Sequence, residues 1–425
     1  MSEHYDEHYI ASVTAMGDTH MVTASQAIFT RNGIKLVNAG TRIDSTLRDR
    51  LIQHKLMPDI DRCLVVENGV TPASLRDAAR EILLEERFAA IRDILPESER
   101  FLNAIQGVQL NAPLAFKLTV AREKFPLLFR HSLQVALIAL FLGIRDRMND
   151  RELVDVATAA LFHDLGEMHI DPAVLGANGW LDGAALRQIS VHSTTGYLIL
   201  QAFPEYSPEI REAVLDHHER MDGSGYPRGV KGEEISPLSQ VIMLSEVVAT
   251  LLEQSWEKCG VSRLAMMLKM NRKRFSATLI DHIAPAFVGN APNVAPMPAE
   301  TLSTQLRQLA EVFQLWHATY KPEHVSQASA LVKFVDQRLV AVERSLHETG
   351  FQPNEFSALL SNVQDDLDMI AEMQLMLRES QWMVSSLIKE TQRRWHDFVA
   401  QGQGCARVEQ WIERALPLLQ TAPTP

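Results

Sequence analysis

The chain contains little cysteine, with three residues among 425. Cys63, Cys259 and Cys405 lie far apart and form no CxxC pair, so the sequence offers no disulfide framework. So few and so widely separated cysteines are typical of proteins from a reducing compartment. We expect these thiols to be buried.

An excess of positive charge is also absent. Lys and Arg number 41 against 53 Asp and Glu, which gives a formal net charge of −12. A protein that binds a polyanion through charge alone has the opposite balance. We therefore expect no nucleic acid polymer among the partners.

Long hydrophobic runs are missing as well. The longest, VALIALFLGI at 135–144, is far shorter than the ~20 residues that a membrane-spanning helix needs, so it predicts a buried helix. The first residues, MSEHYDEHYI, are acidic and lack the basic start and apolar core of a signal peptide. We therefore expect a cytoplasmic protein that has no membrane partner.

Sequence patterns typical of β-strands occur only near the N-terminus. In AIFTRNGIKLV at 27–37, Asn32 and Gly33 stand between two β-prone runs, which is a strong hairpin pattern. The segment CLVVE at 63–67 has the composition of a further strand. We predict a small β-rich module over residues 1–70.

Helical periodicity dominates the rest of the chain, which we divide into four parts. These are a helical connector at 71–112, a helical domain at 113–288, a Pro-rich linker at 289–300 and a C-terminal helical bundle at 301–425. The bundle carries two apolar stripes, which are Leu331, Phe334, Val335, Leu339, Val342 and Leu346, and Val363, Leu367, Ile370, Met373 and Leu377. Such stripes are usually core, so we assign this part no chemistry and regard it as a candidate surface for homodimerisation or partner docking.

Histidines gather in the middle of the chain, where six of the fifteen fall between positions 131 and 218. Several stand beside acids, as in His163-Asp164 and in the run Asp216-His217-His218-Glu219. Imidazole and carboxylate together suit iron, manganese or zinc, and a carboxylate can bridge two ions. The pattern favours a binuclear metal site.

A single histidine is more often a hydrogen-bonded, partly buried side chain than a metal ligand. We keep that interpretation for His169, which stands outside the doublets. Adjacent residues on a helix point about 100° apart, so a doublet reaches one centre only where the helix ends. Gly166, Gly223 and Gly225 follow the doublets and are expected to provide such ends.

Four segments carry a family resemblance: FRHSLQVA, FHDLGE, SVHSTTGYLIL and LDHHERMDGSGYP, in this order. They resemble the HD-GYP branch of the HD superfamily of metal-dependent phosphohydrolases, over about residues 113–260. The resemblance implies an all-helical bundle with a metal centre that hydrolyses the bacterial second messenger cyclic di-GMP. The whole chain is then mainly α, with an HD-type bundle between the β-rich module and the C-terminal bundle.

The resemblance also implies roles for individual residues. His163 and Asp164 would be the catalytic HD pair, and Asp164 would bridge two divalent transition-metal ions, iron or manganese with zinc as an alternative. The complete ligand set would be His131, His163, Asp164, His192, His217, His218 and Glu246. The loop that shapes the pocket rim and offers a surface to protein partners would contain Asp222, Gly223, Gly225, Tyr226 and Pro227.

The chain departs from the family pattern at several positions. Glu167 replaces a lysine that can approach a substrate phosphate, and a carboxylate there would repel the phosphate by about 1 to 4 kcal/mol. Glu246 stands where the family has an aspartate, and ATLLEQSWEKCG replaces a basic, aromatic segment. Leu127 occupies the position of a glutamate that binds a third ion in some members, so we expect two ions.

Four cations near the loop are candidate phosphate contacts, but we expect them to be solvated surface charges. They are Arg220, Arg228, Lys231 and Lys258.

These observations leave three hypotheses. The first is a metal-dependent phosphodiesterase that hydrolyses cyclic di-GMP. The second is a catalytically impaired adaptor that keeps the fold and acts through protein partners, as Glu167 and the missing basic segment suggest. The third is a phosphohydrolase for another nucleotide.

Overall fold

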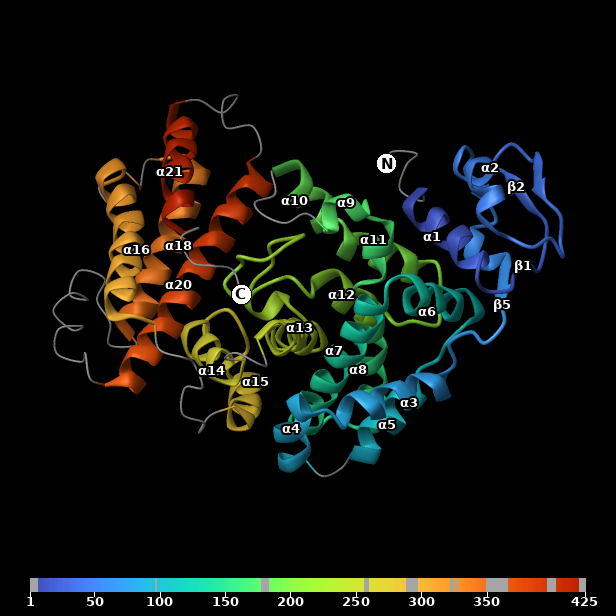
Figure 1. Ribbon diagram of the computed structural model, residues 1–425, viewed down its shortest axis with the longest axis horizontal. Coiled ribbons are helices and arrows are strands. Elements are labelled where there is room, and N and C mark those ends of the chain that lie inside the picture. Colours follow the sequence, from blue (N-terminus) through green and yellow to red (C-terminus); the bar gives the residue numbers. More distant parts are fainter. Residues whose placement is uncertain are drawn as a thin grey trace. The chain divides into compact units, whose positions relative to one another are not determined.

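The computed structural model describes residues 7–95, 98–176, 183–255, 260–287, 297–321, 325, 328–348, 366–395 and 403–419. The chain divides into two compact units, Met1–Asn178 with Gln188–Thr250, and Gly179–Arg187 with Leu251–Pro425. The protein is mainly helical and has small β-sheets near its N-terminus, which confirms the predicted fold class (Figure 1).

The N-terminal module contains two small antiparallel sheets. One pairs β1 (Val22–Ala24) with β5 (Leu64–Val66), and the other has the order β3-β2-β4, from Lys35–Val37, Ile28–Thr30 and Leu56–Met57. The β2–β3 hairpin is the predicted one, and its Gly33 has a φ of +80°, which favours glycine. Short helical turns at η1 (Ser45–Leu47), α2 (Arg48–Ile52) and η2 (Ile60–Arg62) connect the strands.

A helix that the sequence analysis did not predict precedes these sheets. This helix, α1 (Glu7–Gly17), buries Tyr9, Ile10, Val13 and Met16. Thr14 and Gly17 lie on the same buried face. They interrupt the apolar stripe in the sequence, and the helix was not predicted for this reason. The predicted β-rich module therefore also contains a helix.

Helices of the first unit surround the long apolar helix α7 (Pro126–Arg145), which packs against α3 (Pro72–Leu83), α5 (Ser98–Gln106), α6 (Ala112–Lys124) and α8 (Asp150–Phe162). Among the described residues, α7 is the one helix long and apolar enough to span a membrane, with a mean hydropathy of 1.8 over a window that is 72% buried. Residues 135–144 are all buried, which confirms the predicted buried helix.

The remaining elements of this region follow in chain order. After η3 (Glu86–Phe88) and α4 (Ala89–Ile94), which precede α5, they are η4 (Leu165–His169), α9 (Pro172–Leu175), α10 (Gly183–Ser190), α11 (His192–Gln201), α12 (Pro208–Asp216), η5 (Gly232–Glu234) and α13 (Pro237–Ser255). Within the first unit, α11 packs against both η4 and α12, and α12 packs against α8. These contacts bring the ends of α8, α11 and α12 together.

The second unit is a helical bundle. It contains α14 (Gly260–Met270), α15 (Ala277–Ile283), η6 (Ala284–Ala286), α16 (Ala299–Thr319), α18 (Ala330–Glu348), α20 (Leu367–Arg394) and α21 (Gln403–Leu419). Its core includes Trp316, which is fully buried and meets Trp411 edge to face at 5.2 Å. Residues 288–296, most of the predicted linker, lie outside the described residues.

The two predicted stripes form part of this core. Leu331, Val335, Leu339, Val342 and Leu346 are buried, as are Ile370, Met373 and Leu377, and Phe334 packs against the core from a half-buried position. The prediction was wrong for Leu367, which is 61% exposed because it is the first residue of α20. Val363 lies outside the described residues.

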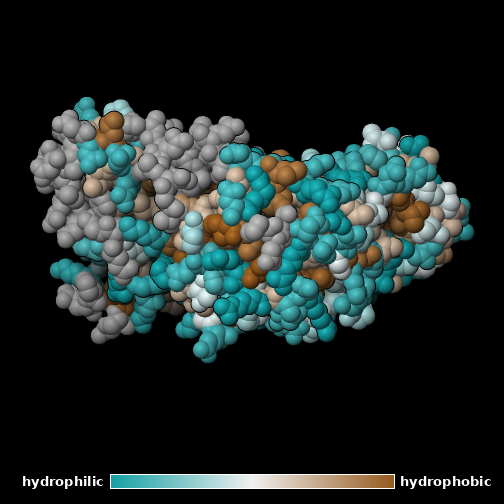
Figure 2. All heavy atoms as spheres, turned by 90° about the horizontal axis from the view of Figure 1, so that it is seen from below, coloured by the Kyte–Doolittle hydropathy of each residue, from teal (hydrophilic) through white to brown (hydrophobic). Residues whose placement is uncertain are grey.

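On the face that Figure 2 shows, hydrophobic residues form separate groups among hydrophilic ones. The most exposed large hydrophobic side chains in the described part of the chain are Leu127 at 83%, Leu84 at 68% and Ile34 at 63%. Scattered exposures of this kind are normal for a folded protein and mark no site by themselves.

Candidate metal centre

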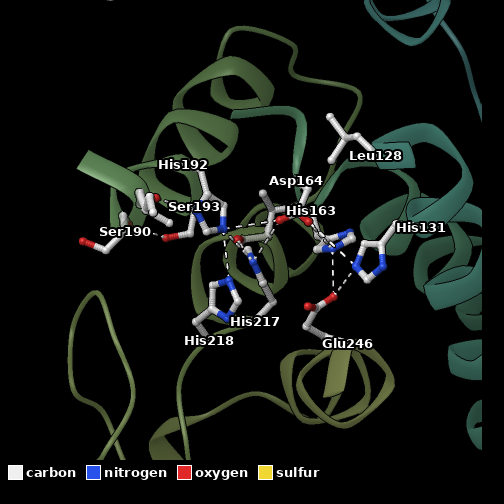
Figure 3. A network of polar contacts seen from close by, with 12 residues as sticks. Leu128, His131, His163, Asp164, Ser190, His192, Ser193, His217, His218 and Glu246 are labelled. Carbon is white, nitrogen blue, oxygen red and sulfur yellow. Dashed lines mark hydrogen bonds and ion pairs between the residues drawn. The ribbon is translucent and has the colours of Figure 1, made fainter. Parts of the chain in front are cut away.

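The predicted ligands converge from five parts of the first unit. His131 lies in α7, His163 and Asp164 follow α8, His192 begins α11, His217 and His218 follow α12, and Glu246 lies in α13. Figure 3 shows their side chains pointing toward one another. The structure thus brings together all seven side chains, and they form two groups that share Asp164.

The first group consists of His131, His163, Asp164 and Glu246, whose candidate ligand atoms lie within 4.8 Å of one another. Glu246 Oε2 lies 2.7 Å from His131 Nε2 and 3.2 Å from His163 Nε2. Asp164 Oδ2 lies 3.0 Å from His163 Nε2. Two imidazole nitrogens and two carboxylate oxygens therefore face one small volume, which suits a divalent transition metal.

The second group consists of Asp164, His192, His217 and His218. His192 Nε2 lies 3.0 Å from His217 Nε2 and 3.1 Å from His218 Nε2. Asp164 Oδ1 lies 3.3 Å from His192 Nε2 and 3.4 Å from His217 Nε2. Asp164 therefore turns one oxygen toward each group, which is the arrangement that a bridging carboxylate requires.

Two buried atoms in these groups make no hydrogen bond, namely His163 Nε2 and Asp164 Oδ1. Buried polar groups are normally satisfied, and leaving one without a partner costs about 1–3 kcal/mol. A cation bound by each group would satisfy these atoms. The donors and their orientation therefore fit a pair of divalent ions.

Backbone carbonyls orient three of the imidazoles. The Nδ1 atoms of His163, His192 and His217 each lie 2.7 Å from the carbonyl oxygen three residues earlier, that of Ala160, Ile189 and Val214. A carbonyl only accepts, so each Nδ1 donates, and Nε2 is the ring atom that can bind a metal once the imidazole is neutral. This support was not predicted from the sequence. The recurring position of these histidines at helix termini was the available signal.

Gly166 and Gly225 allow close approach of the backbone. A Cβ at Gly166 would stand 2.0 Å from the carbonyl oxygen of His192, and one at Gly225 would stand 2.2 Å from Glu219 Cα. The sequence analysis assigned these glycines to helix ends, but close packing is their clearer role. Gly223 has a φ of +75° and provides the expected turn.

Aromatic stacking supports the loop after α12. Tyr226 stacks on His218 with the ring centroids 4.6 Å apart and an interplanar angle of 27°. Asp222 Oδ1 accepts a hydrogen bond from the backbone N–H of Ser224 at 2.9 Å. The predicted loop residues therefore stabilise the turn and pack against one face of the His218 ring, which is a candidate metal ligand.

Two arginines beside the histidine doublet, Arg220 and Arg228, make contacts with this segment that were not predicted from the sequence. Arg228 forms a two-contact pair with Asp216, which is 1% exposed, and its backbone N–H donates to Glu219 Oε1 at 2.6 Å. Arg220 is 8% exposed and donates to the carbonyl oxygen of Glu219 at 2.6 Å. The prediction of a solvated charge was wrong for Arg220, which is buried. Arg228 is exposed, as expected, with 42% of its side chain accessible, and it also pairs with the buried Asp216.

Lys231 is exposed, as expected, and Lys258 lies outside the described residues. His169 is 9% exposed, stacks on Tyr9 at 4.8 Å and lies 3.3 Å from Lys117 Nζ. Its surroundings are those of a structural histidine, as we expected.

Glu167 lies beside the first group on η4. Burial, together with the negative charges of Asp164 and Glu246, raises the pKa of Glu167 to about 8. In the metal-free protein this carboxyl is therefore mostly protonated at pH 7. The predicted repulsion of a phosphate assumed a charged carboxylate, which this environment disfavours.

The imidazoles differ in protonation. Burial lowers the pKa of His192 to about 4 and that of His218 well below its usual value, so both are neutral and ready to bind metal at pH 7. Burial alone would also lower the pKa of His163, but Asp164 and Glu246 outweigh it and raise this pKa to about 10. His163 is therefore protonated in the metal-free protein.

We predict that metal binding at pH 7 to 8 releases protons and becomes tighter as the pH rises. His163 must lose its proton before Nε2 can bind a cation, and one linked proton changes the affinity by up to about tenfold per pH unit. Calorimetry in buffers of different ionisation enthalpy measures the proton release. An affinity that stays constant between pH 6 and 9 would contradict the assignment of His163 as a ligand.

Comparisons with known proteins agree with this geometry. The family model described as HD domain matches residues 118–279. The 3'3'-cGAMP-specific phosphodiesterase 3 of Vibrio cholerae is 33% identical over 132 residues, 31% of this chain and 28% of that protein. The 3'3'-cGAMP-specific phosphodiesterase 1 of the same organism is 29% identical over 201 residues, 46% of each chain.

A cyclic di-GMP phosphodiesterase of Thermotoga maritima is 34% identical over 117 residues, 27% of this chain and 31% of that protein. The chain thus spans less than half the length of these curated relatives. A solved HDG"Y"P protein of Bdellovibrio bacteriovorus, Bd1817, aligns with 63% of this chain and 95% of its own at 12% identity, and its TM-score of 0.35 is too low to support an argument. Residues 118–279 thus match an HD domain, and this part of the chain is similar, at about 30% identity, to phosphodiesterases of cyclic di-GMP and 3'3'-cGAMP.

Proposed function

We propose that this protein is a metal-dependent phosphodiesterase that hydrolyses a cyclic dinucleotide, in the first place cyclic di-GMP. The observation that supports this most strongly is the pair of adjacent ligand groups that share Asp164. Two ions held side by side supply Lewis acidity to an in-line attack of water on a phosphodiester. Iron and manganese suit the mixed imidazole and carboxylate donors, and zinc is the alternative.

The residues of the chain have distinct tasks in this proposal. Asp164 would hold both ions, because its two oxygens face different groups. The carbonyls behind His163, His192 and His217 fix the imidazole orientation before metal binds. A site organised in advance loses little free energy to rearrangement during the reaction.

The substrate class rests on the relatives. Their names assign them cyclic di-GMP or 3'3'-cGAMP, two substrates that share the cyclic arrangement of two phosphodiesters. We therefore predict that the metal-loaded protein converts at least one of them to a linear dinucleotide or to mononucleotides. Chromatographic separation of the products after incubation with each compound tests this directly.

The combined variant His163→Ala with Asp164→Ala is the matched negative control. It should lose both metal and activity, and full hydrolysis by this variant would contradict the proposal. Bound metal in the wild-type protein without any product from either compound would instead favour the adaptor hypothesis.

A further inference from the structure

The two oxygens of the Glu246 carboxylate have different partners. Oε2 faces the first group and lies 2.7 Å from His131 Nε2. Oε1 accepts a hydrogen bond of 3.1 Å from the hydroxyl of Thr250, which lies one helical turn later on α13. Thr250 therefore contacts a candidate metal ligand from outside the site.

The hydroxyl of a helical threonine commonly donates to the backbone carbonyl four residues earlier. Thr158 in α8 does so, with a distance of 2.7 Å to the carbonyl oxygen of Val154. Ser245, the neighbour of Glu246, donates to the carbonyl oxygen of Val241 at 2.8 Å in the same way. Thr250 instead has a hydrogen bond to the side chain of the residue four positions earlier.

A glutamate needs this support more than an aspartate would. Its carboxylate has one more rotatable bond, and ordering that bond for metal binding costs conformational entropy. Thr250 is stiff at χ1 because it is β-branched, so its hydroxyl is a well-placed donor. The hydrogen bond restrains the orientation of the Glu246 carboxylate before the metal arrives.

We infer that Thr250 is a positioning residue that reserves Glu246 Oε1 for a hydrogen bond and leaves Oε2 to bind the first ion. This inference rests on the proposed function, because it assumes that the first group holds a metal. A carboxylate that binds through one oxygen leaves a coordination position open, which a catalytic metal site requires. Thr250 would thus allow a glutamate to act as a metal ligand at the position where the family has an aspartate.

The experiment is a titration of Mn²⁺ into metal-free protein against a competing chelator. The first site is identified as the one that His131→Ala removes. Thr250→Val keeps the shape of the side chain but lacks the hydroxyl, and it should weaken the first site about tenfold, as loss of an outer hydrogen-bond partner typically does. Thr250→Ser keeps the hydroxyl and should bind Mn²⁺ nearly as tightly as the wild type.

Two controls separate positioning from general damage. Thr158→Val removes a buried helical hydroxyl that touches no ligand and should leave Mn²⁺ affinity unchanged. Glu246→Asp shortens the side chain and withdraws the carboxylate from Thr250. Adding Thr250→Val to this variant should therefore cause no further loss of Mn²⁺ affinity. Thermal unfolding of each metal-free variant checks that the fold is retained.

The outcomes are distinct. Three results would overturn the inference while leaving the proposed function intact. They are wild-type Mn²⁺ affinity in Thr250→Val, an equal loss of Mn²⁺ affinity in Thr158→Val, and an unchanged effect of Thr250→Val when Glu246→Asp is also present. A wild-type protein that binds no Mn²⁺ would contradict both. Tight Mn²⁺ binding without hydrolysis of a cyclic dinucleotide would contradict the proposed function alone.

Discussion

Asp164→Asn should abolish binding of both metal ions and reduce hydrolysis below detection. Asparagine has nearly the same volume as aspartate but carries no negative charge and offers one oxygen instead of two. Because Asp164 belongs to both ligand groups, one substitution affects both sites. Elemental analysis of the purified variant, with a hydrolysis assay on the same sample, measures the result.

A matched control is Asp61→Asn. Asp61 is also buried and paired with a cation, since it is 9% exposed and lies 2.9 Å from Lys117 Nζ, but it belongs to neither ligand group. Its replacement should leave the metal content unchanged, even if it lowers the melting temperature. His131→Ala and His192→Ala should each remove one ion. Retention of both ions by Asp164→Asn would show that the carboxylate does not bridge them.

Gly225→Ala should have the second large effect, a loss of metal from the second group together with a lower free energy of unfolding. The new Cβ would stand 2.2 Å from Glu219 Cα and 2.4 Å from the carbonyl oxygen of His218. The backbone that carries His218 must therefore move. Overpacking of this kind typically costs about 1 to 3 kcal/mol.

Chemical denaturation of the metal-free protein and Mn²⁺ titration measure the two effects separately. Gly69→Ala is the comparison, because a Cβ there meets Thr119 Oγ1 at an ordinary 3.5 Å. The first site, which involves His131 and Glu246, should be less affected than the second. Normal Mn²⁺ binding by Gly225→Ala would mean that the loop adjusts without disturbing His218.

Local patterns in the sequence predicted the parts of the fold that local chemistry determines. Asn32-Gly33 favours a tight turn wherever it occurs between β-prone runs, and the hairpin is present. The motif residues of the two doublets were assigned to one centre through a family resemblance, and the structure places them together. Short-range information was sufficient for the hairpin, whereas the assignment of the ligands to one centre depended on the family resemblance.

Features that depend on packing between distant segments could not be predicted in this way. Arg228 is the exposed charge that the sequence predicted, but its pairing with Asp216, buried twelve positions earlier on α12, was not predicted. The close approach of Gly166 to His192 likewise joins segments that are 26 positions apart. No local pattern reports such contacts, because the fold of the whole first unit creates them.

The most direct test of the account is the metal content of anaerobically purified protein, measured with cyclic dinucleotide hydrolysis on the same sample. We expect about two transition-metal ions per chain, one for each ligand group, and a linear or mononucleotide product. At most one ion per chain after metal loading, with no product from cyclic di-GMP or 3'3'-cGAMP, would contradict it.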